Sequence, residues 1–163
     1  MVNRARMEEQ LALHEGLRLK AYRDSLGLLT VGIGYCIDKR GVKPLEAIIG
    51  RRFEGGVTRD EAYKVLRADI DRFEAGCLKA FPFYAKLDEV RQRVCLDMAF
   101  NMGYGALGFR KTIALVEKRR YVEAGNEMMD SKWADDVGDG WGGQLDRAER
   151  LAIMMKTGKD WDR

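Results

Sequence analysis

Three polar residues near the N-terminus, Glu15, Asp24 and Thr30, have the types that a hydrolytic site needs. Cleaving a glycosidic bond requires a carboxylic acid that protonates the leaving oxygen and a second carboxylate on the other side of the sugar. Glu15 lies among leucines, and an apolar environment favours the protonated carboxyl that serves as an acid. Asp24 lies in a charged turn, where we expect it to stay ionised. A helix-end glutamate, a turn aspartate and a strand threonine are also ordinary structural residues, so spacing alone leaves both interpretations open.

Counts of histidine and cysteine exclude several other chemistries. The 163 residues include one histidine, His14, and three cysteines that are far apart and form no C-x-x-C pair. A zinc hydrolase usually needs at least two histidine ligands, and a cysteine–histidine nucleophile would depend on His14 alone. The spacing also favours free thiols over disulfides. We therefore expect carboxylate chemistry, with no metal and no cofactor.

Composition and charge are those of a folded globular protein, with 46% hydrophobic and 34% charged residues. The net charge of +3 suits an anionic partner, but basic and acidic residues alternate along the chain, so nucleic acid gains only weak support. No run of 18 apolar residues occurs, and residues 1–10 lack the apolar core of a signal peptide. These features predict no stable membrane association and a cytoplasmic location.

A helix followed by a small sheet must position the three residues. Residues 3–15 have a modest helical pattern, whereas residues 19–36 break into short apolar pieces separated by glycines. Glycine-punctuated pieces of this kind are typical of a two- or three-stranded hairpin sheet. Glu15 would then end the helix, while Asp24 and Thr30 would lie on the hairpin.

The remaining sequence is predicted to be helical. Thr58 and Glu61 form a capping-box pattern at the start of a long helix with one apolar face. Asp88 has the position of an N-cap, and the helix that it begins ends at Gly103. Shorter helical patterns and an acidic, glycine-rich loop complete the chain: helices at 44–49, 106–118, 122–129 and 145–156, and the loop at 135–143.

Together these elements predict a mostly helical α+β fold with two lobes in one domain. We expect a small β-containing lobe at 14–57, a connecting helix at 58–80, and a helical lobe formed by 1–13 and 81–163. Substrates often bind in clefts between lobes. We therefore expect Glu15 and Asp24, at the helix-to-sheet corner, to face such a cleft.

The stretch E-G-L-R-L-K-A-Y-R-D-S-L-G-L-L-T-V-G-I-G, residues 15–34, resembles the phage-type lysozymes (endolysins), in particular those of the T-even bacteriophages. The resemblance continues in order along nearly the whole chain, through G-V-T-R-D-E-A, L-D-E-V-R-Q-R-V, M-A-F-N-M-G, S-K-W, D-R-A-E-R and T-G-K-D-W-D. It implies a lysozyme-like fold and hydrolysis of the β-1,4 bond between N-acetylmuramic acid and N-acetylglucosamine in bacterial peptidoglycan.

The resemblance also implies a role for each of the three residues. Glu15 is the general acid, Asp24 orients and activates the attacking water, and Thr30 helps to hold that water. The family inverts the anomeric carbon, which implies a carboxyl separation of roughly 6.5–9.5 Å with room for water. Arg147 matches an arginine that pairs with the catalytic glutamate. Its positive charge would favour the ionised carboxylate and oppose the effect of burial, so the charge state of Glu15 stays open.

Four further residues match positions that line the saccharide cleft in this family: Cys36, Phe100, Thr112 and Glu127. Phe100 offers an apolar ring face and Thr112 a hydroxyl, although a core aromatic and a helix-surface threonine are equally open interpretations. The family commonly has an aliphatic residue at Cys36 and often asparagine at Glu127. Tyr35 stands where close relatives commonly have histidine, so a histidine–aspartate ion pair is not expected there.

The loop at 134–146 is longer than in the close relatives and directly precedes Arg147. It is either a lid or specificity element over the cleft, or a tolerated insertion on the surface. The resemblance implies a monomer that binds peptidoglycan and depends on a holin for release from the host cytoplasm, leading to host cell lysis.

Three other functions are alternative interpretations of this sequence. Residues 46–66 could form a DNA-binding helix-turn-helix. The carboxylates of that region oppose a phosphate-facing surface: Asp60, Glu61, Asp69 and Asp71. A wall-binding or baseplate-type protein with this fold and little turnover is possible because fold alone does not establish function. A lytic transglycosylase would use a lone acid, whereas Asp24 and Thr30 favour water as the nucleophile.

Overall fold

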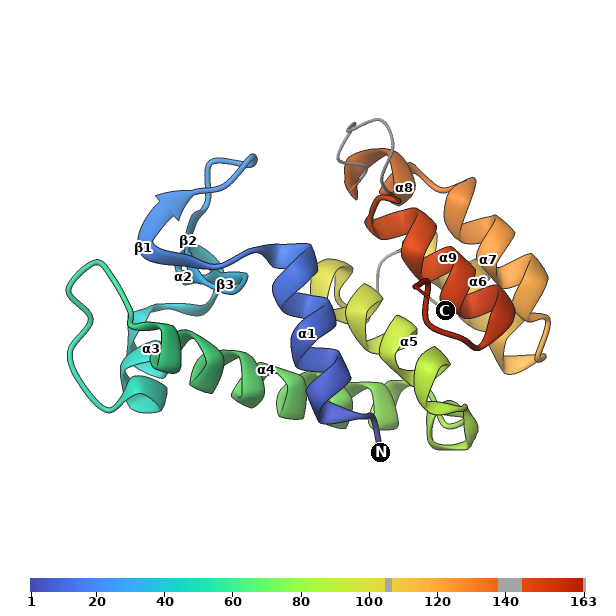
Figure 1. Cartoon of the computed structure of the whole chain (residues 1–163), viewed down its shortest axis with the longest axis horizontal. Coiled ribbons are helices and arrows are strands. Elements are labelled where there is room, and N and C mark those ends of the chain that lie inside the picture. Colours follow the sequence, from blue (N-terminus) through green and yellow to red (C-terminus); the bar gives the residue numbers. More distant parts are fainter. Residues whose placement is uncertain (105–106, 138–144, 163) are drawn as a thin grey trace. The chain divides into compact units, whose positions relative to one another are not determined.

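The computed structural model describes residues 1–104, 107–137 and 145–162, without the side chains of 107–108. Helices dominate these residues, and one small three-stranded antiparallel sheet lies near the N-terminus (Figure 1). The mostly helical α+β fold predicted from the sequence is therefore confirmed. No helix in the described ranges is long and apolar enough to cross a membrane.

The chain divides into two compact units, which are described separately. One contains residues 4–72, and the other contains residues 1–3 with the described residues from 73 onward. The boundary falls inside the long helix α4 (Arg59–Ala80). The first helix, α1 (Arg4–Glu15), groups with the sheet, whereas the sequence-based lobes put residues 1–13 with the later helices. Glu8 of α1 accepts hydrogen bonds from Arg67 of α4, which helps to hold α1 in this unit.

In the first unit, α1 is followed by the sheet and two short helices. The sheet has the order β1-β2-β3 and is antiparallel throughout. The elements after α1 are β1 (Arg18–Arg23), β2 (Leu29–Gly32), β3 (Tyr35–Cys36), α2 (Ile37–Arg40) and α3 (Val42–Ile49). The predicted hairpin sheet is confirmed. The one-turn helix α2 has too few residues to show a periodic pattern, and the sequence did not predict it.

The core of this unit lies between the sheet and the helices α3 and α4. Val31 and Tyr35 are paired across β2 and β3, and both are fully buried with Leu45 and Val65. The Tyr35 hydroxyl donates to the carbonyl of Gly41 at 3.0 Å. Tyr35 is therefore a packed core residue.

A buried ion pair lies beside Tyr35. The Arg40 guanidinium lies 4.0 Å from the Tyr35 ring centroid and donates to Asp69 at 2.5 Å. Asp69 is 1% exposed, so its carboxylate needs such a partner. Arg40 is that partner.

The start of α4 carries the predicted capping box. The Glu61 amide donates to the Thr58 hydroxyl at 3.2 Å, and the Thr58 amide donates to the Glu61 carboxylate at 2.8 Å. Arg51 adds two hydrogen bonds to the same carboxylate, at 2.6 and 2.7 Å. These donors, Arg51 first, lower the pKa of Glu61 to about 2.

The second unit is built from helices. After the end of α4 come the 3₁₀ helix η1 (Tyr84–Lys86), α5 (Glu89–Met102), α6 (Leu107–Glu117), α7 (Tyr121–Met129), α8 (Lys132–Val137) and α9 (Arg147–Thr157). Asp88 caps α5 by accepting from the Arg91 amide, as predicted. Helix α7 packs against both α6 and α9 (Figure 1). The middle of α5 is buried, in agreement with its apolar sequence.

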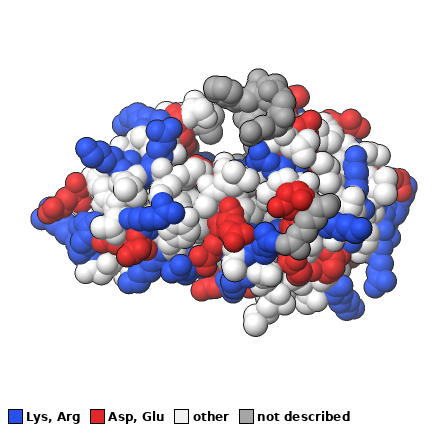
Figure 2. Space-filling model, viewed as in Figure 1, with Lys and Arg blue, Asp and Glu red and all other residues white. Residues whose placement is uncertain are grey.

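The surface carries charges of both signs. Basic and acidic side chains are mixed on the face shown in Figure 2, and no large area of that face carries one sign alone. A nucleic-acid site usually has a basic patch that follows the phosphates. The visible surface therefore adds no support for a nucleic-acid partner.

Candidate active site

Glu15 ends α1, as the sequence predicted, and is half-buried. The next residue, Gly16, has a φ of 70° and donates its amide to the Ala12 carbonyl at 3.1 Å. Glycine takes this left-handed conformation without strain and is the usual residue just after a helix. The E-G pair therefore stops the helix directly after the candidate acid.

Asp24 holds the turn between β1 and β2 together. Its Oδ1 accepts the amides of Leu26 and Leu28, both at 2.9 Å, and its own amide donates to the Leu28 carbonyl at 3.0 Å. An aspartate commonly closes a turn in this way. In the described part of the chain no hydrogen bond or ion pair uses the second carboxylate oxygen, Oδ2. Oδ1 thus forms the hydrogen bonds of the turn, and Oδ2 can accept a proton from a ligand or water.

Thr30 lies in the central strand β2 and is 4% exposed. Its hydroxyl donates to the carbonyl of Leu28 at 3.2 Å. Since a hydroxyl has one proton and two lone pairs, the Thr30 oxygen keeps its capacity to accept. The carbonyl that orients Thr30 belongs to the residue whose amide Asp24 holds, so one turn positions both side chains.

A row of side chains crosses the sheet through Thr30. In the strand pairing, Thr30 lies opposite Tyr22 on β1 and opposite Cys36 on β3. Directly opposed residues in antiparallel strands have side chains on the same face, with Cβ atoms about 4.5–5.5 Å apart. Tyr22, Thr30 and Cys36 therefore share one face. Asp24 lies in the turn directly after β1, two residues beyond Tyr22.

Tyr22 is the residue that sequence reasoning missed. Burial raises the pKa of its phenol, and the negative charges of Glu15 and Asp24 raise it further. The Arg18 guanidinium, 5.4 Å from the Tyr22 ring centroid, acts in the opposite direction. Both candidate catalytic carboxylates are thus close enough to one phenol to influence its ionisation. The sequence signal for a role of Tyr22 was its position two residues before Asp24. A tyrosine at that position is equally consistent with a core or a surface residue.

The three other predicted saccharide contacts lie on helices of the second unit. The Phe100 ring, on α5, is half-buried and packs against Phe73 with 5.0 Å between centroids. Thr112, on α6, is 1% exposed, so a sugar contact would require its hydroxyl to become accessible. Glu127, on α7, lies 3.6 Å from the ammonium of Lys111. Their contacts with a saccharide stay predictions.

Arg147 lies at the start of α9, behind a capping box formed by Asp146 and Glu149. It is 7% exposed, and its Nε donates to Oδ1 of Asp97 at 2.9 Å, with Nη2 2.7 Å from the same oxygen. Asp97 lies on α5 and is fully buried. Arg147 therefore has a buried carboxylate partner in its own unit, which the sequence did not predict. The pairing with Glu15 stays a prediction.

The acidic loop before Arg147 is only partly described. The loop predicted from residue 135 was wrong for residues 135–137, which continue α8. Trp133 anchors this helix, because it is buried and its indole donates to Asn101 at 3.0 Å. The central part of the predicted lid, residues 138–144, lies outside the described residues.

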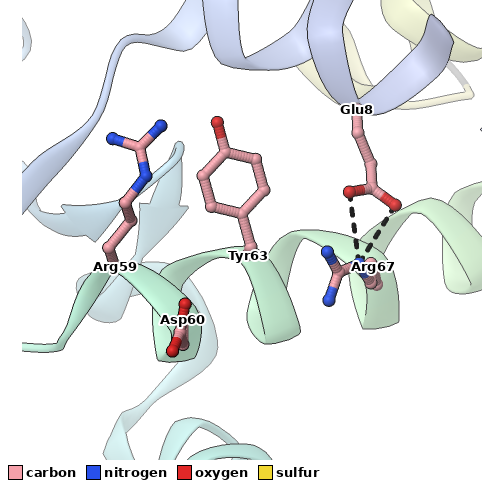
Figure 3. A pocket seen from close by; sticks show the side chains of 5 residues that line it. All are labelled: Glu8, Arg59, Asp60, Tyr63 and Arg67. Atoms are coloured by element: carbon pink, nitrogen blue, oxygen red, sulfur yellow. Dashed lines mark hydrogen bonds and ion pairs between the residues drawn. The ribbon is translucent and has the colours of Figure 1, made fainter. Parts of the chain in front are cut away.

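A pocket of about 330 Å³ lies elsewhere in the first unit, on α1 and α4. Figure 3 shows Glu8 reaching from α1 towards Arg67 of α4. Arg59 lies over the Tyr63 ring, 5.4 Å from its centroid. The lining residues are Glu8, Arg59, Asp60, Tyr63 and Arg67. None of the predicted site residues lines this pocket, so it is distinct from the candidate active site.

The cysteines differ in their surroundings. Cys77 and Cys95 are buried free thiols, and burial raises the pKa of Cys77 to about 12. Burial also raises the pKa of Cys95. Cys36 is free and half-buried, on the same sheet face as Thr30. The buried pair is therefore unsuited to nucleophilic chemistry, because the thiolate is the reactive form.

A helical α+β fold with a glutamate at the end of its first helix and an aspartate in the following hairpin turn is lysozyme-like. Residues 12–150 match the model of the phage lysozyme family, and the chain belongs to that family.

Several curated proteins are similar along most of the chain. Probable T4-type lysozymes 1 and 2 of Dictyostelium discoideum are 26% and 28% identical over 168 residues, covering 93% of this chain and 94% of each relative. The pre-baseplate central spike protein Gp5 of Enterobacteria phage T4 is 30% identical over 166 residues. That match covers 93% of this chain and 28% of the spike protein.

Proposed function

We propose that this protein is a muramidase that hydrolyses the β-1,4 bond between N-acetylmuramic acid and N-acetylglucosamine in peptidoglycan. Membership of the phage lysozyme family and the likeness to T4-type lysozymes support the reaction class. The observation that carries the proposal is the division of labour within Asp24. Its Oδ1 is held by two backbone amides, while Oδ2 takes part in no hydrogen bond or ion pair in the described part of the chain and is left to act on water.

In the proposed reaction Glu15 gives its proton to the leaving glycosidic oxygen. A water molecule donates one hydrogen bond to Oδ2 of Asp24 and another to Oγ1 of Thr30, and attacks the anomeric carbon from the opposite face. As the new C–O bond forms and the glycosidic bond breaks, the water proton passes to Asp24. Displacement by water from the opposite face inverts the anomeric centre. Proton transfer of this kind typically contributes 10²–10⁴-fold to the rate.

We further propose that Cys36, Phe100, Thr112 and Glu127 contribute to saccharide binding and that Arg147 supports the site. The biological role that best fits this reaction is that of an endolysin. It would accumulate in the host cytoplasm, reach the wall after holin-dependent release, and lyse the host. Family membership supports this role.

The likeness to the T4 spike protein favours one alternative, a wall-binding or baseplate-type domain with little turnover. The two functions differ in catalytic rate rather than in fold. Turnover of purified peptidoglycan therefore distinguishes them.

The test compares wild-type protein with Glu15→Gln on purified peptidoglycan, with new chain ends identified by mass spectrometry. Reducing N-acetylmuramic acid ends that only the wild type produces would support the proposal. Anhydro ends would indicate a lytic transglycosylase. If neither protein releases fragments while both bind the wall, the binding-domain alternative would replace the enzyme.

A further inference from the structure

The peptide group between Leu28 and Leu29 is hydrogen-bonded at both of its polar ends. Its carbonyl, that of Leu28, accepts the Asp24 amide at 3.0 Å and the Thr30 hydroxyl at 3.2 Å. Its N–H, that of Leu29, donates to Oδ2 of Asp38 at 2.8 Å. Because a peptide group is planar, a carboxylate that fixes its N–H also fixes the direction of its carbonyl. Asp38 therefore holds the peptide group to which both Asp24 and Thr30 are bonded.

Asp38 is itself held in place from two sides. It lies in the first turn of α2, and Arg40 of the same helix donates to the buried carboxylate of Asp69 at 2.5 Å. Towards the sheet, Nη1 of Arg23 lies 3.7 Å from Oδ2 of Asp38 and donates to the Gly27 carbonyl at 2.7 Å. The Asp38 carboxylate thus joins α2 to the turn between β1 and β2.

The charge of Asp38 makes this contact different from an ordinary turn hydrogen bond. A hydrogen bond to a carboxylate is shorter and stronger than one between neutral groups. Hydrogen bonds in a chain also polarise one another, so an acceptor on the N–H makes the Leu28 carbonyl a better acceptor for the Thr30 hydroxyl. With its proton on that carbonyl, the Thr30 oxygen presents its lone pairs to a water molecule.

We infer that Asp38 is a positioning residue, which holds the Thr30 hydroxyl through the 28–29 peptide group in the orientation that accepts from the attacking water. This inference rests on the proposed hydrolysis. In this role Asp38 acts through Thr30 and needs no contact with the sugar. Its loss should therefore lower kcat and leave KM nearly unchanged.

The first variant is Asp38→Ala, which removes the acceptor of the Leu29 amide. Hydrogen bonds to charged groups are the stronger ones, but solvent screens this half-exposed side chain, so kcat on soluble glycan chains should fall roughly 3- to 10-fold. Asp38→Asn keeps an oxygen acceptor and should recover part of the loss. The matched control is Glu46→Ala, because Glu46 accepts the Phe53 amide at the same 2.8 Å outside this turn. It should keep the wild-type kcat.

A comparison of two backgrounds separates positioning from simple stabilisation. Thr30→Val keeps the β-branched shape and removes the hydroxyl, so Asp38→Ala should cost little further kcat in that background. Equal fold losses in both backgrounds would overturn the inference. An unchanged kcat in Asp38→Ala, or a raised KM alone, would also overturn it. If Asp38→Ala does not fold, Asp38→Asn takes its place in the comparison.

The orientation of Thr30 can also be measured without turnover. Three-bond NMR couplings should show one side-chain rotamer of Thr30 in the wild type and in Glu46→Ala, and averaging between rotamers in Asp38→Ala. An unchanged rotamer in Asp38→Ala would overturn the inference, and this result decides if Thr30→Val has no measurable rate. A wild type without turnover, with Thr30 still ordered by Asp38, would instead remove the proposed function itself.

Discussion

Asp24 and Leu28 close the β1–β2 turn by two reciprocal hydrogen bonds. The Leu28 amide donates to Oδ1 of Asp24 at 2.9 Å, and the Asp24 amide donates to the Leu28 carbonyl at 3.0 Å. That carbonyl also accepts from the Thr30 hydroxyl. Asp24, which we propose activates the water, is thus part of the turn that positions Thr30, which we propose holds the same water.

The two roles of Asp24 can be separated by substitution. Asp24→Asn keeps an oxygen that can accept the turn amides but removes the charge, so its stability should stay close to that of wild type. Asp24→Ala loses both hydrogen bonds and should be less stable by about 1 kcal/mol or more. Both should lose hydrolysis by at least about 100-fold. Urea unfolding and release of soluble glycan test this, and near-wild-type activity in Asp24→Asn would contradict the assigned role.

Cys36 provides a chemical probe of the sheet face. It is half-buried, whereas Cys77 and Cys95 are buried with raised pKa values, so a bulky thiol reagent should modify Cys36 first in the folded protein. An adduct beside Thr30 should slow hydrolysis strongly. Mass spectrometry of the adduct and the residual rate measure both effects. Cys36→Val should be resistant, and full activity of a protein modified at Cys36 would remove this residue from the site.

The Asp97–Arg147 pair predicts a stability effect. Removing one partner of a buried ion pair typically costs about 3–5 kcal/mol, because the other charge stays buried. We expect Asp97→Leu to lose stability in this range and Asp97→Leu/Arg147→Met to recover most of it. Arg150→Met, on the same helix, should change stability by less than about 0.5 kcal/mol. Urea unfolding measures all three, and a double variant no more stable than Asp97→Leu would refute the pairing as the cause.

Glu61 predicts part of the pH dependence of stability. Its pKa is about 2 in the folded protein and lies near 4.5 ordinarily, mainly because Arg51 donates to it. The stabilisation is therefore present above about pH 4.5 and is lost as the pH falls towards 2. Glu61→Gln should be less stable than wild type at pH 6, with a smaller difference at pH 3. Thermal unfolding at both pH values tests this, with exposed Glu117→Gln as the control; a constant difference would contradict it.

Local patterns in the sequence were sufficient to predict most elements of the fold. Caps at Thr58 and Asp88 depend on residues three positions away, and the glycines after Glu15 break helix periodicity. Such signals are local and therefore readable. The short helices α2 and α8 were missed because one or two turns do not establish a period, and α8 depends on the distant contact between Trp133 and Asn101.

The candidate site was only partly predictable for the same reason. The types and spacing of Glu15, Asp24 and Thr30 suggested carboxylate chemistry, and the family resemblance supplied their roles. Strand register, which places Tyr22 opposite Thr30, depends on how three strands pair. The partner of Arg147 on α5 depends on helix packing across 50 residues of sequence. Neither the strand register nor this helix contact can be predicted from local patterns in a single sequence.

The anomeric configuration of the first product tests the central claim, that water positioned by Asp24 displaces the leaving sugar directly. Proton NMR during the first turnovers on a soluble β-1,4-linked glycan reports this before mutarotation mixes the anomers. We predict the α-anomer of the new N-acetylmuramic acid end from the wild type and no such signal from Asp24→Asn. The β-anomer as first product would require a covalent or substrate-assisted intermediate, and it would contradict the account.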